Sequence, residues 1–111
     1  MSRERFEELV SVALDEVPGE LSTLIDNCVV LVEDDSARGD LLGLYEGTPL
    51  TDRGLGYTMT LPDRITIFRN PTLEMCGSEA EVVRQVRITV VHEIAHHFGI
   101  DDARLHELGY G

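Results

Sequence analysis

Cysteine, lysine and long apolar runs are scarce or missing in this 111-residue chain. The two cysteines, Cys28 and Cys76, are too few and too far apart for a disulfide scaffold, and neither has a cysteine partner at metal-site spacing. We therefore expect two free, buried thiols. No apolar run approaches the roughly 20 residues that cross a bilayer. The N-terminus leads into an amphipathic pattern rather than a signal-peptide core. These absences predict a soluble, cytoplasmic protein.

Positive charge is also scarce. All nine basic residues are Arg, and 21 acidic residues bring the net charge to −12. Nucleic acid and anionic membrane both bind basic surfaces, so this balance argues against either partner. With 42% hydrophobic and 27% charged residues, a chain of this length is expected to form one globular domain over residues 1–111. Composition does not indicate an oligomeric state.

Hydrophobic spacing predicts a helix near each end of the domain. Between Phe6 and Val17, apolar residues recur every three or four positions, which is the spacing of an amphipathic helix. Ser2 is the expected cap and Pro18 the expected stop. A capping box at residues 78–81 opens a second helix that should end near Phe98. The expected core-facing stripe of this second helix consists of Val83, Val86, Val90, Ile94 and Phe98.

Between these helices the sequence predicts three strands. A short irregular or helical piece at residues 20–26 precedes an apolar, β-branched run at residues 28–32, which is typical of a buried strand. Residues 41–47 contain two glycines, which suggest a bulge or the close approach of another backbone. Breakers indicate a loop at 48–61, and residues 65–68 form a third strand ending at Asn70-Pro71. The expected class is α+β, with about three to four strands covered on one face by helices.

The C-terminal helix carries the chemistry, in the sequence V-H-E-I-A-H-H-F-G-I-D-D. His92 and His96 are four apart, so they project from one helix face and can share a metal ion. Glu93 is placed to take a proton from a water molecule activated by that metal. Gly99 can end the helix in the left-handed conformation and let the chain bring Asp102 back. His92, His96 and Asp102 then form a three-ligand set for a metal ion with a fourth position open.

This motif resembles the H-E-x-x-H-x-x-G-x-x-D variant of the zincin metallopeptidases, and the whole chain resembles the small bacterial zincin-like family. The similarity is most recognisable in residues 41–50, 65–71 and 92–109. The resemblance implies a minimal zincin fold, with zinc on His92, His96 and Asp102 and with Glu93 as the general base. It also implies a peptide or protein substrate.

Three other residues near the motif are expected to have supporting or surface roles. His97 lies about a quarter turn from His96 and is predicted to be structural, or to support a ligand rather than bind metal. His106, on a short terminal helix with Leu105 and Leu108, should be a surface residue. Either Asp101 or Asp102 could cap that helix. Tyr110 lies close to the end of the sequence, where fraying is expected.

Two further functions compete with peptide hydrolysis. The metal site of bacterial rRNA-maturing endoribonucleases has the same histidine spacing, but carries a third His where this chain has Asp102 and a small residue in place of Glu93. The carboxylate at position 93 and the acidic surface favour peptide hydrolysis over RNA cleavage. The other alternative is a non-catalytic domain that uses the metal, or the acidic cleft, only to bind a partner protein.

Overall fold

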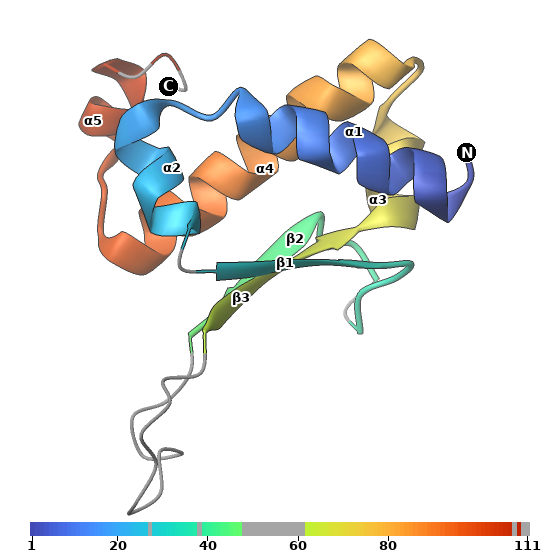
Figure 1. Cartoon of the computed structure of the whole chain (residues 1–111), viewed down its shortest axis with the longest axis horizontal. Coiled ribbons are helices and arrows are strands. Elements are labelled where there is room, and N and C mark those ends of the chain that lie inside the picture. Colours follow the sequence, from blue (N-terminus) through green and yellow to red (C-terminus); the bar gives the residue numbers. More distant parts are fainter. Residues whose placement is uncertain (27, 38, 48–61, 108, 110–111) are drawn as a thin grey trace, which may run out of the picture.

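The helices that the structure describes lie on one side of a small sheet, and none of them lies on the other side (Figure 1). The computed structural model describes residues 1–26, 28–37, 39–47, 62–107 and 109. Those residues form five helices and a three-stranded mixed sheet. This two-layer arrangement confirms the α+β class. The loop expected at residues 48–61 lies outside the described residues, and none of the described helices is long and apolar enough to span a membrane.

The first helix, α1 (Arg3–Asp15), begins where the sequence predicted. The Ser2 hydroxyl accepts a hydrogen bond from the Arg5 N–H at 3.1 Å, which satisfies one of the four donors left open at a helix start. The apolar face of α1 is buried, with Phe6 fully enclosed. The next segment is helical too, as α2 (Gly19–Ile25) after Pro18.

The sheet has the strand order β1-β3-β2. Its strands are β1 (Cys28–Glu33), β2 (Gly43–Glu46) and β3 (Asp63–Phe68), all within or close to the predicted ranges. The central strand, β3, pairs with β1 in parallel and with β2 antiparallel. Within the described sheet, β1 and β2 are therefore the two edge strands, and each presents one free edge.

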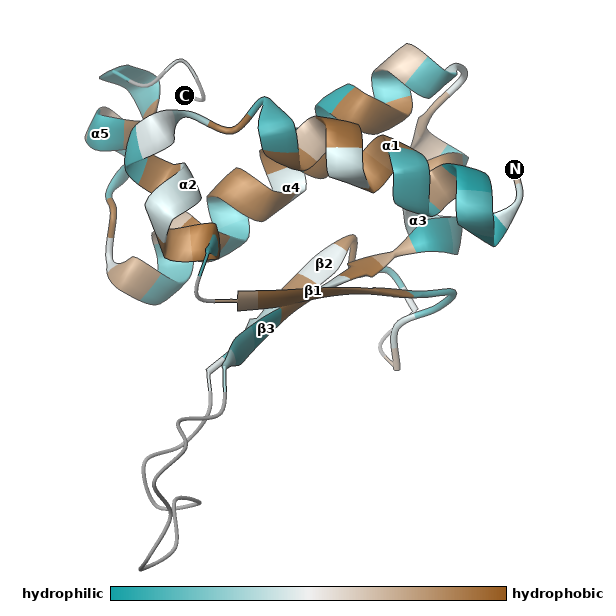
Figure 2. Ribbon diagram, viewed as in Figure 1, coloured by the Kyte–Doolittle hydropathy of each residue, from teal (hydrophilic) through white to brown (hydrophobic). Residues whose placement is uncertain are grey.

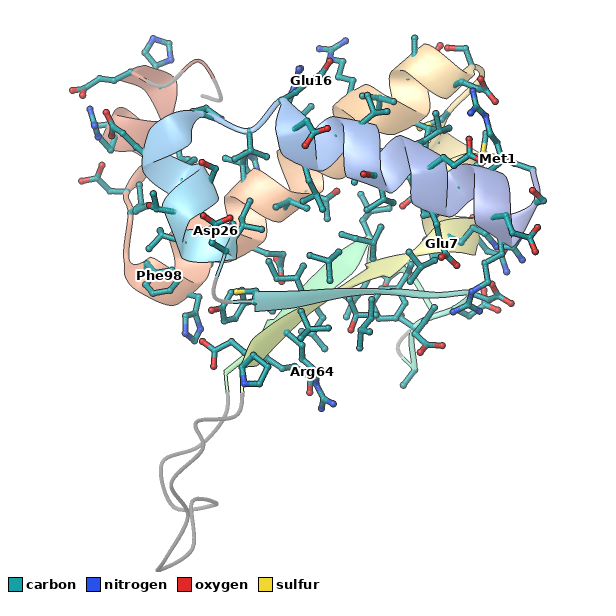
Figure 3. The ribbon with its side chains drawn as sticks, in the orientation of Figure 1. Met1, Glu7, Glu16, Asp26, Arg64 and Phe98 are labelled. Atoms are coloured by element: carbon teal, nitrogen blue, oxygen red, sulfur yellow. The ribbon has the colours of Figure 1, made fainter. Side chains whose placement is uncertain are left out.

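The prediction that the first strand is buried was wrong for one of its faces. Val29 and Leu31 are 42% and 39% exposed, whereas Val32 is buried. A continuous apolar run suggests burial on both faces, but here helices cover only one. Figure 3 shows Arg64, the register partner of Val29 on β3, projecting from the uncovered side. Apolar side chains on this side remain accessible to solvent.

The sequence did not predict helix α3 (Arg69–Met75), which follows β3 directly. Asn70-Pro71 was interpreted only as the end of a strand. Pro71 lies in the first helical turn, where a missing N–H costs nothing because that group has no partner within the helix. The Thr72 hydroxyl donates to the Phe68 carbonyl at 2.8 Å and ties the turn back to the end of the strand.

The long helix, α4 (Glu79–Phe98), has the predicted limits. The Ser78 hydroxyl accepts from the Glu81 N–H at 3.2 Å. The Glu81 carboxylate accepts from the Gly77 N–H at 3.0 Å, rather than from Ser78 as a standard capping box would require. At the other end, Gly99 takes the left-handed conformation with φ of 71°, which allows the helix to stop there.

The buried face of α4 is wider than the predicted stripe, because the helix packs against both α1 and the sheet. Hydrophobic residues extend along α1, α4 and β1 (Figure 2). Val83 is partly buried and packs against the core, whereas Phe98 is 45% exposed, so the predicted stripe was wrong at Phe98. The residues of α4 that are buried are Val82, Val86, Thr89, Val90, Val91, Ile94 and Ala95.

We predict that Phe6→Ala destabilises the protein by about 3–5 kcal/mol, because it removes a fully buried ring between α1 and the rest of the core. Val12→Ala is the control on the same helix, since Val12 is 46% exposed and its truncation should cost little. Urea denaturation monitored by circular dichroism measures both. Equal losses in the two variants would contradict the packing described here.

Candidate active site

The residues of the H-E-x-x-H motif lie on the last turns of α4. The helix continues to Phe98, so His92 and His96 stand one turn apart on one face. His92 and Glu93 are half-buried, and His96 is exposed. The fold therefore presents the motif at the surface while its helix is anchored in the core.

Glu93 meets the edge strand β2. One oxygen of its carboxylate, Oε1, accepts a hydrogen bond from the Tyr45 N–H at 3.1 Å. The Leu42 carbonyl accepts from the Phe68 N–H at 2.9 Å, so the backbone groups of even-numbered residues face β3. Those of Gly43 and Tyr45 point outward by the same alternation. The Glu93 carboxylate consequently lies at the free edge of the sheet.

Gly43 allows α4 to come this close. A Cβ atom at position 43 would lie 2.6 Å from the Thr89 methyl carbon Cγ2 and 3.2 Å from the Thr66 carbonyl oxygen. The glycines of this segment were expected to mark a bulge or the close approach of another backbone. The group that approaches Gly43 most closely is instead a side chain of the motif helix.

The Tyr45 side chain connects the sheet to the end of α4. Its hydroxyl donates to Asp63 Oδ2 at 2.7 Å and accepts from the Cys28 thiol at 3.4 Å. Its ring stacks on His97, with centroids 4.0 Å apart and an interplanar angle of 27°. Phe98 makes edge contacts with both rings. His97 therefore packs against the sheet, in keeping with the structural role expected for it.

Burial raises the pKa of the Tyr45 phenol well above its ordinary value near 10, and the hydrogen bond that the phenol donates to the Asp63 carboxylate raises it further. The phenol therefore stays protonated across the physiological range and keeps donating to Asp63. Both cysteines are free thiols, as predicted, although each is half-buried rather than fully buried. Burial also raises the pKa of the Cys76 thiol.

Asp102 is the first residue of the short helix α5 (Asp102–Glu107) and is exposed. Its neighbour Asp101 provides the cap, accepting from the Arg104 N–H at 2.9 Å. Buried Leu105 and an ion pair between Arg104 and Glu20 of α2 attach the helix to the domain. His106 is exposed as expected, and residues 108 and 110 lie outside the described residues.

Two imidazoles and a carboxylate are donor types that suit zinc. The structure supplies the imidazoles from adjacent turns of one helix. Across the described ranges, however, no three His, Cys, Asp or Glu side chains are gathered as a metal site. The part of the site that the structure shows is thus the histidine pair beside Glu93. The three-ligand set with Asp102 stays a prediction.

Sequence reasoning missed Tyr45, Asp63 and Thr89 as neighbours of the motif. A signal was present, because the alternation of a strand predicted at residues 41–47 places Gly43, Tyr45 and Gly47 on one side of it. The pattern indicates an aromatic ring flanked by two positions without side chains, where another element can come close. It does not indicate which helix comes close there, since that helix lies more than 40 residues away in sequence.

An H-E-x-x-H helix set against the edge of a small mixed sheet is the architecture of a zincin-like protein. The chain belongs to the zincin-like metallopeptidase family, whose model matches residues 25–111. Among solved structures it is similar to a conserved hypothetical protein from Thermus thermophilus, with 24% identity and a TM-score of 0.59, over 88% of this chain and 94% of the other. That likeness supports the fold alone. No curated protein matches the chain.

We predict that the Tyr45 phenol does not ionise near pH 10, because its burial and the hydrogen bond that it donates to Asp63 favour the protonated form. Spectrophotometric titration of wild type and Tyr45→Phe at about 295 nm measures this directly. The difference between the two curves should stay flat through pH 10 and rise only at more alkaline pH. A step near pH 10 in the difference curve would show an ordinary, solvated phenol.

Proposed function

We propose that this protein is a zinc-dependent peptidase that cleaves an extended segment of a peptide or protein. The observation that supports this most directly is the position of the Glu93 carboxylate, at the free edge of β2 and on the same helix as His92 and His96. Membership of the zincin-like metallopeptidase family points to the same chemistry.

Proton transfer is the role we assign to Glu93. The Tyr45 N–H binds Oε1, so Oε2 is the candidate acceptor for a proton from the attacking water. The same carboxyl group would then deliver the proton to the leaving amine. Zinc held by His92, His96 and Asp102 would supply a more acidic water and a polarised peptide carbonyl. An aspartate ligand adds negative charge to such a site, so we expect modest activity.

The substrate class follows from the edge strand. The Tyr45 N–H is already bonded to Glu93, so an extended peptide would pair with the other outward backbone groups of β2, those of Gly43 and the Tyr45 carbonyl, and would then pass beside Glu93. The net charge of −12 favours peptides that carry positive charge, because opposite charges attract at long range. We therefore propose basic, unstructured segments as the preferred substrates.

We predict that Glu93→Gln abolishes peptide cleavage, with kcat/KM falling by about 100-fold or more, while zinc content stays unchanged. Glutamine keeps an acceptor for the Tyr45 N–H but cannot take up a proton. Glu74→Gln, an exposed change on α3, is the control. A fluorogenic peptide library provides the rate. Equal activity of Glu93→Gln and wild type would remove the general-base assignment.

A parallel assay with structured RNA separates the other functions. Cleavage of RNA but not of peptides would favour the endoribonuclease alternative. Cleavage of neither by zinc-loaded protein would favour a non-catalytic domain that binds a partner. Peptide cleavage that stops on chelation and returns with added zinc is the result we expect.

We predict that Asp102→Asn lowers zinc affinity by more than roughly 10–100-fold. A loss of that size is typical when the changed residue only hydrogen-bonds to a metal ligand, and loss of a ligand itself should cost more. The matched control is Asp101→Asn, which removes one charge from the adjacent position but preserves a residue that can cap α5. Competition with a chelating dye measures both affinities. Equal affinities in the two variants would exclude Asp102 as a ligand.

A further inference from the structure

Three residues of the motif helix face three positions of the edge strand in matched register. Thr89, Glu93 and His97 follow one another at intervals of four on α4. They meet Gly43 and Tyr45 of β2 and Gly47, the residue directly after it, which follow at intervals of two. Four helical residues rise about 6.0 Å and two strand residues about 6.8 Å, so the two elements stay in step over this length.

The outer pairs of this register are steric contacts. A Cβ on Gly43 would lie 2.6 Å from Thr89 Cγ2, and a Cβ on Gly47 would lie 3.0 Å from His97 Cε1. Position 43 therefore accepts glycine and little else while Thr89 stays where it is, whereas at position 47 the exposed His97 side chain could give way by a few tenths of an ångström. The central pair is polar, since the Tyr45 N–H donates to Glu93. The close contact at Gly43 thus limits how near α4 can come when the central hydrogen bond forms.

Tyr45 also keeps the strand from sliding along the helix. Its hydroxyl binds Asp63 on β3 and the Cys28 thiol on β1, while its ring stacks on His97. The backbone N–H that holds Glu93 is therefore fixed from both sides. A one-residue slip would break all of these contacts and would point a different N–H outward.

We propose that the segment Gly43–Gly47 is a positioning device that holds the Glu93 carboxylate in one orientation through the Tyr45 N–H. Gly43, Tyr45 and Thr89 act through Glu93 and are positioning residues. The effect on turnover rests on the proposed function. The positioning itself does not, and it is measurable in metal-free protein.

Hydrogen exchange of single amides tests the positioning. The Tyr45 amide lies at the free edge of the sheet, so its bond to Glu93 is what protects it from exchange. In Glu93→Ala this amide should exchange at least about 10-fold faster, whereas the inward-facing amides of Leu44 and Glu46 should be unchanged. An equally protected Tyr45 amide in the variant would overturn the proposal, whether or not the protein is a peptidase.

A rescue experiment tests the steric part. Gly43→Ala places a methyl group against Thr89 and should accelerate exchange at Tyr45, and Thr89→Ser removes the Cγ2 atom that this methyl group meets. The double variant should recover most of the protection of the Tyr45 amide. Some strain should remain, because the new methyl group would still lie 3.2 Å from the Thr66 carbonyl oxygen. Gly19→Ala is the control, because no described atom lies within 4 Å of a Cβ there. Failure of the double variant to recover would overturn the register.

The same variants connect positioning to turnover. Gly43→Ala should lower kcat by up to about 100-fold with little change in KM, because a displaced base misaligns the proton transfer rather than weakening substrate binding. Thr89→Ser should restore kcat in the double variant. A fully active Gly43→Ala would overturn the catalytic consequence. An inactive wild type with the expected exchange pattern would reject the proposed function and leave the positioning intact.

Discussion

The close contact between α4 and the free edge of β2 is the constraint on which the rest of the structure depends. Gly43 admits the Thr89 methyl group, and the Tyr45 N–H can then reach the Glu93 carboxylate. The same helix carries the core on its other sides, with Val86, Val90 and Ile94 fully enclosed. Core packing and the candidate chemistry therefore share one rigid element, and displacement of α4 would disturb both.

The distribution of charge complements this apolar framework. Most described arginines join separate elements, as in the contacts of Arg5 with Glu79, Arg69 with Asp34, and Arg87 with Glu16. The carboxylate of each pair is exposed to solvent, so we expect each pair to contribute about 1 kcal/mol or less, and stability to come mainly from the core. Because the few cations are used in this way, most of the remaining surface charge is negative, which suits a positively charged substrate.

Elements specified by neighbouring residues were predictable. Ser2 and Ser78 cap their helices through bonds to residues three positions ahead, and Gly99 ends α4 with a positive φ. The spacing of His92 and His96 needs only a helix to become a shared face. Prediction failed at two places: Asn70-Pro71, interpreted as the end of a strand, lies in the first turn of α3, and the apolar run of β1 does not reveal that one face has no cover.

By itself, the sequence determined that a histidine pair and a glutamate stand on a capped helix. The helix, its cap and the spacing of these residues depend only on contacts within about one or two turns. Only the tertiary structure decided that Glu93 meets the backbone of Tyr45, 48 residues away, and that the short terminal helix is tied to α2 through Arg104. Such pairings depend on how far two surfaces can approach. That distance is set by the volume of side chains such as the Thr89 methyl group, which periodicity does not encode.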